Sequence, residues 1–121
     1  MKHPDDRVYL EHILDAIAKI ERYLSGMDRD TFDQDSLVQD GVIRQVQIVG
    51  EACRRLSASL RQRYSSIPWH DITGMRNKLV HDYFGVDLDA VYDAASVDMP
   101  ALKHAIERVL RDLSPADLGG Q

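Results

Sequence analysis

The chain has 121 residues, of which 44% are hydrophobic and 29% are charged, a composition that excludes a disordered or fibrous protein. Its formal net charge of −5 argues against broad, non-specific binding of nucleic acid, which favours a basic surface. The length predicts one domain over residues 1–121, with an ordered core at about 5–113 and a frayed C-terminal tail from Ser114 to Gln121.

Targeting and redox signals are weak in this sequence. The first residues, Met1 to Asp6, lack an apolar signal core, and no run of residues is long and apolar enough to span a membrane. We therefore expect a cytoplasmic protein. Cys53 is the only cysteine, which excludes an intrachain disulfide, and its apolar neighbours predict a buried thiol.

The first predicted element is an amphipathic helix from Asp5 to about Leu24, because apolar residues recur there at three- and four-residue steps. Ser25-Gly26 is typical of a helix end. The next segment, Asp28 to Asp33, is polar and turn-like. Phe32 within it is interpreted as an apolar plug that folds back onto the core.

A second, long helix is predicted from Asp35 or Ser36, both good N-caps, to about Arg63. Gly50 inside this helix costs about 1 kcal/mol of helix stability relative to Ala. We interpret this glycine as a point where another helix approaches closely.

Charged residues gather in the second half of this helix and beyond it. Glu51 is an acid in the apolar stripe, which suggests a carboxylate at an interface or one paired with Arg44 or Arg76; a catalytic role is the alternative. The basic residues form either a local surface for nucleic acid or simply a solvated helix face. They are Arg54, Arg55, Arg61, Arg63, Arg76 and Lys78.

After a short loop, Tyr64 to Ile67, a third helix is predicted from Pro68-Trp69 to about His81. A fourth covers about Leu88 to Leu113, and Pro100 should kink or divide it. No strand-like alternation persists. The sequence therefore predicts an all-α, up-down bundle of four to five helices.

Two groups of residues resemble metal sites but are incomplete. His70-Asp71 and His81-Asp82 lack the further His and Asp ligands that His-Asp metal centres need. Asp87, Asp89 and Asp93 begin like a calcium loop but lack its Gly and Glu, and Asp87 or Asp89 more simply caps the fourth helix. The sequence predicts no metal and no cofactor.

The chemistry-bearing residues concentrate in the segment Gly74 to Gly85. Residues five apart on an ideal helix lie about 140° apart around the axis and about 7.5 Å along it. Arg76 and His81 therefore share no face of a regular helix. They can converge on one ligand at a helix end or across a dimer seam. Past a helix end, an extended chain would turn His81 and Tyr83 to the same side.

These residue types suit the cleavage of an RNA phosphodiester. Arg76 offers a permanently charged, planar fork for phosphate oxygens. His81 can accept and return a proton near neutral pH, and Asn77 can hydrogen-bond a phosphate or a ribose 2′-OH. Because RNA supplies its own 2′-OH as nucleophile, no Ser, Cys or metal is needed. On residue types alone, a chance Arg and His pair is the alternative.

Arg76, His81 and Tyr83 are spaced as Arg-x4-His-x-Tyr, with Asn77 after the arginine. This spacing resembles the signature of the HEPN domain, and specifically of its HepT toxin branch.

Two further blocks carry the same resemblance. Ile48-Val49-Gly50-Glu51-Ala52 is similar to an Ile-Gly-Glu-Ala stretch of the HepT branch, and Tyr83-Phe84-Gly85-Val86-Asp87, followed by a helix with Pro100, also fits. The resemblance covers roughly Asp5 to Leu113, with the blocks in the right order.

The resemblance implies a homodimeric endoribonuclease toxin of a toxin-antitoxin pair, with two Arg-x4-His motifs lining a shared cleft. Arg76 would bind and polarise the scissile phosphate, His81 would act as general acid and base, and Asn77 and Lys78 would bind substrate. Cleavage would be metal-independent and leave a 2′,3′-cyclic phosphate.

The implied partner is an MntA-like nucleotidyltransferase antitoxin that transfers AMP from ATP to the motif tyrosine, here Tyr83. AMP would add bulk and negative charge beside His81 and so repel RNA. Two alternatives stay open. Tyr83 could instead be a core tyrosine packed with Phe84. The whole chain could be a non-catalytic module that dimerises and docks a nucleotidyltransferase or binds nucleotide, which the acidic net charge favours.

Overall fold

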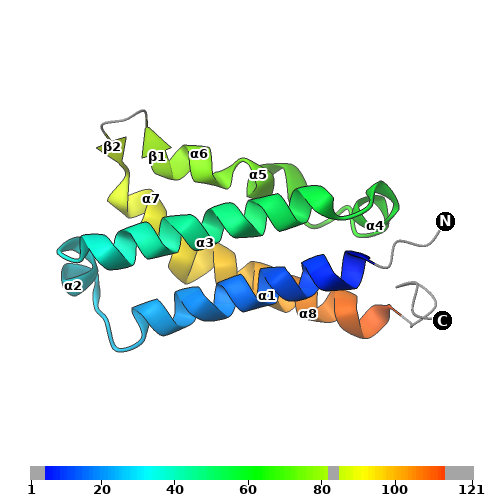
Figure 1. Ribbon diagram of the computed structural model, residues 1–121, viewed down its shortest axis with the longest axis horizontal. Coiled ribbons are helices and arrows are strands. Elements are labelled where there is room, and N and C mark those ends of the chain that lie inside the picture. Colours follow the sequence, from blue (N-terminus) through cyan, green and yellow to red (C-terminus); the bar gives the residue numbers. More distant parts are fainter. Residues whose placement is uncertain (1–4, 82–84, 114–121) are drawn as a thin grey trace.

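A computed structural model describes residues 5–81 and 85–113 and shows a helical bundle (Figure 1). Its three longest helices are α1 (Asp5–Leu24), α3 (Ser36–Arg55) and α8 (Met99–Asp112). α3 runs antiparallel to α1 and packs between α1 on one side and the shorter helices α5 and α6 on the other (Figure 1). The predicted all-α, up-down architecture is confirmed.

α1 has the predicted bounds, and the chain turns after it at Gly26, whose φ of 72° is the left-handed conformation that glycine adopts easily. The polar segment predicted as a turn is a short helix, α2 (Arg29–Asp33), capped by Asp28, whose side chain accepts from the Thr31 N–H at 2.8 Å. Phe32 is fully buried, so the predicted plug is confirmed.

The second long helix ends at Arg55, and the prediction that it continues to Arg63 is wrong. A separate helix, α4 (Ala58–Arg63), begins after a break at Leu56 and Ser57. The buried carboxylate of Asp6 accepts from the Ser57 N–H at 2.8 Å and from the Ser57 hydroxyl at 2.7 Å. Because Ser57 also caps α4 through the Leu60 N–H, α1 fixes the break.

The third predicted helix is divided and shorter than expected. α5 (Trp69–Thr73) and α6 (Met75–Leu79) meet at Gly74, and the chain then forms an antiparallel pair of two-residue strands, β1 (Val80–His81) and β2 (Gly85–Val86). The sequence did not predict this pair of strands. Two-residue strands are too short to show a period of two in the sequence.

The fourth predicted helix is also composite. α7 (Leu88–Asp93) begins at Asp87, whose side chain accepts from the Ala90 N–H at 3.0 Å, so the predicted Asp87 cap is confirmed. A π-helical segment (Ala94–Asp98) joins α7 to α8. Pro100 lies in the first turn of α8, directly after this segment. The predicted kink or division of the fourth helix is thus present as a π-helical turn before Pro100.

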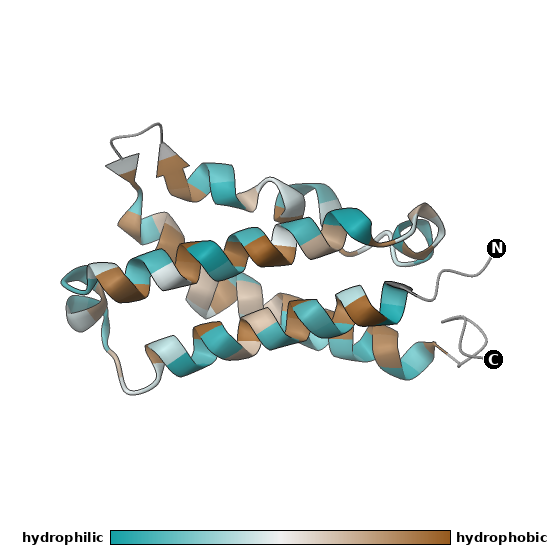
Figure 2. Ribbon diagram, viewed as in Figure 1, coloured by the Kyte–Doolittle hydropathy of each residue, from teal (hydrophilic) through white to brown (hydrophobic). Residues whose placement is uncertain are grey.

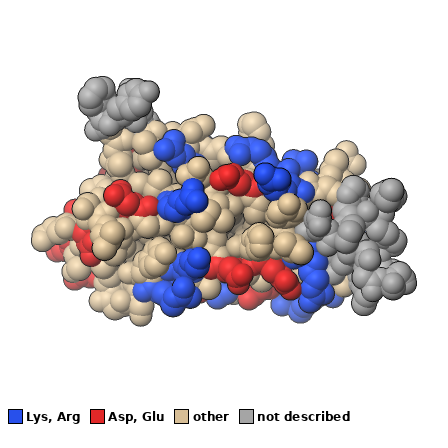
Figure 3. Space-filling model, viewed as in Figure 1, with Lys and Arg blue, Asp and Glu red and all other residues tan. Residues whose placement is uncertain are grey.

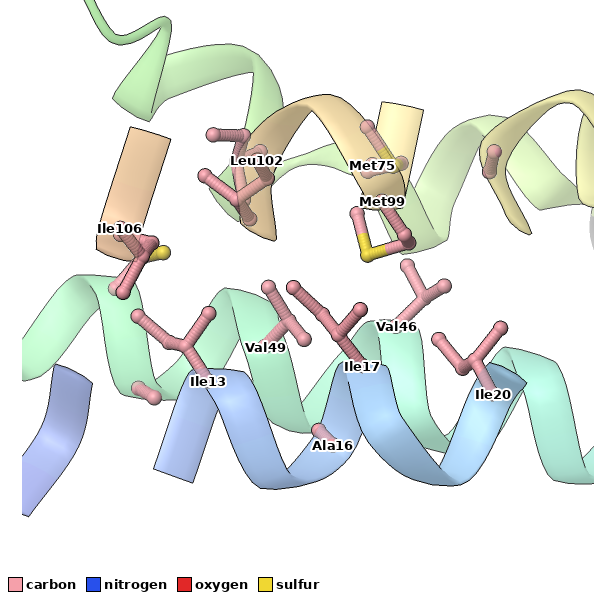
Figure 4. Close-up of a cluster of buried hydrophobic side chains, with 14 of the residues drawn as sticks. Ile13, Ala16, Ile17, Ile20, Val46, Val49, Met75, Met99, Leu102 and Ile106 are labelled. Atoms are coloured by element: carbon pink, nitrogen blue, oxygen red, sulfur yellow. The ribbon is translucent and has the colours of Figure 1, made fainter. Parts of the chain in front are cut away.

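The core lies between α1, α3, α6 and α8, where apolar side chains from all four helices point toward one another (Figure 4). Apolar residues line the inward faces and polar residues the outward faces (Figure 2). Cys53 is fully buried in this core, and burial raises the pKa of its thiol to about 12, against a smaller opposing effect of the Arg61 charge. The predicted buried thiol is confirmed. In the described ranges, no helix has the length and apolarity to cross a bilayer.

Candidate functional site

The motif segment changes from helix to strand between its arginine and its histidine. Arg76 lies in α6, and His81 lies in β1, two residues beyond the last residue of that helix. Of the two arrangements that allow these residues to converge, the first, a helix end near His81, is present. Tyr83 and the contacts predicted for its ring lie outside the described residues.

Backbone geometry explains why the helix stops. The Val80 N–H donates to the Arg76 carbonyl as the last bond of α6, and Val80 itself is extended, with φ −123° and ψ 117°. β1 then pairs with β2, with His81 opposite Gly85. The Asp87 N–H donates to the Leu79 carbonyl at 2.8 Å and closes the base of this hairpin. The end of α6 and the start of α7 thus hold the backbone of His81 in place.

The polar side chains of α6 are exposed, and its apolar residues anchor it. Met75 and Leu79 are buried in the core, whereas Arg76, Asn77 and Lys78 are exposed. No hydrogen bond or ion pair joins the Arg76 guanidinium to another side chain or backbone group of the described residues. Arg76 is therefore available to an external anion.

Lys78 lies on a different side of α6 from Arg76, because residues two apart on a helix differ by about 200°. It lines a hollow of about 420 Å³ between α5, α6 and α8, together with Asp71, Asp98 and Arg108. Arg76 and Asn77 do not line this hollow. The predicted role of Lys78 in substrate binding stays a prediction, and the geometry separates Lys78 from Arg76.

The block around Gly50 supports the start of the motif segment. A Cβ atom on Gly50 would lie 3.3 Å from the Thr73 carbonyl oxygen and 3.4 Å from that of Ile72. One turn further along α3, the Arg54 guanidinium donates to the Thr73 carbonyl at 3.1 Å. The predicted close approach at Gly50 is confirmed, and α3 holds the junction of α5 and α6.

Replacing Gly50 with valine is expected to lower the free energy of unfolding by about 1–3 kcal/mol, because the new side chain must push back the Thr73 backbone. Thermal or urea unfolding measures this loss. Gly74→Ala is the matched control, since the nearest atom to a Cβ there is 3.6 Å away. Equal stability of Gly50→Val and the wild type would contradict the close approach.

Glu51 lies outside the buried stripe of α3, and its predicted interface or catalytic role stays a prediction. It is exposed on the outer side of α3, because it lies two positions from both Val49 and Cys53 and is therefore turned about 200° from each. Neither Arg44 nor Arg76 pairs with it among the described residues. Glu51 instead borders a hollow of about 250 Å³ that Arg44 and Arg55 also line.

The charges of the chain are unevenly distributed. Figure 3 shows basic side chains gathered near the end of α3, toward α4, and acidic side chains around α2 at the opposite end. Arg54, Arg61 and His70 line a hollow of about 590 Å³ between α4 and α5. The sequence grouped the arginines but did not add His70 to them, because the position of His70 beside the same hollow depends on how α5 packs. No group of His, Cys, Asp or Glu within the described ranges is placed to hold a metal ion.

Comparison with known families identifies the class of protein. A family model described as ribonuclease HepT-like matches residues 13–109, which is most of the chain and includes both the Gly50 block and the motif. The chain belongs to this HepT-like ribonuclease family, and the resemblance seen in its motifs is confirmed.

Relatives of the chain carry names of the same kind. It is 36% identical over 101 residues to a "probable ribonuclease HepT" of Thermococcus cleftensis, with 84% of this chain and 92% of that one covered. It is 33% identical over 113 residues to a "putative RNase" of Methanocaldococcus jannaschii, with 93% and 97% covered.

A third relative is longer than this chain. A "gamma-glutamylcyclotransferase and putative RNase" of Methanocaldococcus jannaschii is 38% identical over 109 residues. These residues cover 90% of this chain but only 49% of that protein, so the chain spans about half of its length. No solved structure matches the chain.

Proposed function

We propose that this protein is an endoribonuclease toxin of a toxin-antitoxin pair and that it cleaves RNA through Arg76 and His81. One observation carries the proposal: in a chain of the HepT-like ribonuclease family, the helix ends between these two residues. The strand that follows places His81 next to the helix end, with the exposed Arg76 one turn back. The names of the relatives support ribonuclease activity.

Each residue has a role that its chemistry allows. The guanidinium of Arg76 binds two oxygens of the scissile phosphate and stabilises the charge that grows on them. His81 takes the proton from the 2′-OH as that oxygen attacks phosphorus, and the proton is then given to the 5′-oxygen as the P–O5′ bond breaks. The products are a 2′,3′-cyclic phosphate and a 5′-hydroxyl end. Asn77, also exposed on α6, positions the substrate.

This mechanism needs no metal ion, so we expect RNA cleavage by the wild type to continue at an unchanged rate in excess EDTA. The rate is measured with a labelled oligoribonucleotide in buffer treated to remove metals. Loss of cleavage in EDTA that a divalent metal restores would contradict the mechanism.

The proposed enzyme is a homodimer whose two motifs face one cleft. Supporting this, Val8 is 45% exposed on α1, and the partly buried Tyr9 and Ile48 lie on neighbouring parts of α1 and α3. These apolar side chains would be covered where the two subunits meet. We expect light scattering at micromolar concentration to give about twice the chain mass of 13.8 kDa. A monomer under these conditions would contradict the shared cleft.

A second candidate function is a non-catalytic helical module that dimerises and docks a nucleotidyltransferase or binds nucleotide. The net charge of −5 favours it, and the acidic hollow lined by Asp28, Asp30 and Asp35 suits the docking of a protein with a basic surface. The two functions differ in one result, because the module would bind partners but leave RNA intact.

The antitoxin partner of the proposed ribonuclease toxin is an MntA-like nucleotidyltransferase, which modifies Tyr83.

A further inference from the structure

A basic hollow outside the motif lies where α4 and α5 meet the end of α3. We propose that it is a subsite for a backbone phosphate of the RNA substrate, separate from the phosphate that is cleaved. This inference rests on the proposed function. The hollow has a volume of about 590 Å³, and Arg54, Arg61 and His70 are among the residues that line it. None of the described residues that line it is acidic, although the whole chain carries a net charge of −5.

The two arginines are held in place and still have donors to offer. One guanidinium nitrogen of Arg54 donates to the Thr73 carbonyl at 3.1 Å, which leaves its other N–H groups for a ligand. The Arg61 backbone is fixed because its carbonyl accepts from the Trp69 indole N–H at 3.2 Å. Preorganised guanidinium groups lose little freedom when an anion binds.

Arg61 has an unmet hydrogen bond. Its Nε atom is buried and has no acceptor in the described part of the chain. A buried N–H group without an acceptor is costly, and phosphate oxygens are the acceptors that match a guanidinium best. The charge of the Arg61 guanidinium, together with that of Arg54, makes the hollow suited to an anion with several oxygens.

The place of the hollow relative to the motif indicates which phosphate it takes. Thr73 lines the hollow, and Arg76 follows three residues later in the chain. The three residues cross the junction at Gly74, and a chain of three residues spans at most about 11 Å, which is about three times the rise of about 3.4 Å per nucleotide of a strand. A strand bound at Arg76 reaches the hollow within a few nucleotides.

The indole of Trp69, which lines the hollow, offers no platform for a base. Trp69 is only 8% exposed, and its indole N–H already donates to the Arg61 and Tyr64 carbonyls. Bases bind single-strand sites mainly by stacking on exposed aromatic rings. The subsite should therefore recognise the phosphate backbone without regard to sequence.

The test compares two substrates in the full chain. With an oligoribonucleotide, Arg54→Gln/Arg61→Gln is expected to raise KM about tenfold at unchanged kcat and to flatten the dependence of binding on salt. With a dinucleoside monophosphate, which carries only the scissile phosphate, the same variant should match the wild type. Arg22→Gln/Arg111→Gln removes two exposed arginines elsewhere and should change neither value.

A second variant tests the subsite without removing either arginine, in case the double variant does not fold. Ser65 is exposed and lines the hollow, so Ser65→Glu adds a negative charge without touching either arginine. Ser65→Glu should also raise KM for the oligoribonucleotide and leave KM for the dinucleoside monophosphate unchanged. Unchanged KM and salt dependence in both variants would overturn the subsite, and so would an equal loss on the two substrates. If 5′-AMP displaced a labelled oligoribonucleotide as strongly as the unlabelled oligoribonucleotide does, the hollow would be assigned to free nucleotides. This result would also overturn the subsite.

The subsite and the proposed function fail differently. If the wild type binds the oligoribonucleotide through these arginines but never cleaves it, the subsite stands and the nuclease proposal fails. If cleavage depends on Arg76 and His81 but not on Arg54, Arg61 or Ser65, the nuclease proposal stands and the subsite fails.

Discussion

The His81→Ala variant is expected to cleave RNA about 10²–10⁴-fold more slowly than the wild type, which is the usual effect of removing a general acid and base. The change should leave the fold intact, because β1 pairs with β2 through backbone atoms and the base of the hairpin is closed by the Asp87 N–H and the Leu79 carbonyl. Initial rates on a labelled oligoribonucleotide and far-ultraviolet circular dichroism measure the two effects.

The Arg76→Ala variant should fail in the same assay for a different reason. It removes the group that binds the scissile phosphate, and because Arg76 is exposed and has no partner among the described residues, no fold contact is lost. Arg76→Lys keeps the charge but loses the planar fork and should recover only part of the rate. Arg111→Ala, an exposed arginine on α8, is the control. Full activity in Arg76→Ala or His81→Ala would exclude these residues from catalysis.

The second large effect concerns Tyr83 and the proposed antitoxin. Incubation with the cognate nucleotidyltransferase and ATP should add AMP to the peptide that contains Tyr83: the phenol oxygen bonds to the α-phosphate, pyrophosphate leaves, and the phenol proton goes to solvent. The added negative charge lies two residues from His81 in the sequence and should abolish RNA cleavage by repelling the phosphates of the substrate.

The Tyr83→Phe variant separates modification from catalysis. It should cleave RNA at the wild-type rate, because the mechanism does not use the phenol, but it should take up no AMP and stay toxic in the presence of the antitoxin. Tyr9→Phe, a change in α1, should be labelled and neutralised like the wild type. Intact-mass and peptide mass spectrometry distinguish the cases. Equal labelling of Tyr83→Phe, or AMP on another residue, would overturn the assignment.

The elements that could be predicted from the sequence are those with strong local signals. The apolar periodicity of α1, the turn at Gly26 and the Asp87 cap are all local, and the structure has each of them. The break before α4 was missed, because the carboxylate that holds Ser57 belongs to Asp6, 51 residues earlier in the chain.

The candidate site also has features with a local sequence signal and features without one. The spacing of Arg76 and His81 already required a helix end or a second subunit, and the structure has the helix end. The β1–β2 pair that ends the helix could not be predicted, because two-residue strands are too short to show a pattern in the sequence. The exposure of Glu51 was not predicted, because a sequence stripe shows which residues are near apolar neighbours but not which way a side chain turns.

The most direct test of the central claim is the chemistry of the RNA ends that the purified wild type produces in the presence of EDTA. The Arg76 and His81 mechanism predicts a 2′,3′-cyclic phosphate on one fragment and a 5′-hydroxyl on the other, with no cleavage where the scissile nucleotide is 2′-deoxy. A 3′-hydroxyl with a 5′-phosphate, or cleavage of the 2′-deoxy substrate, would contradict it, because the substrate's own 2′-OH would then not be the nucleophile.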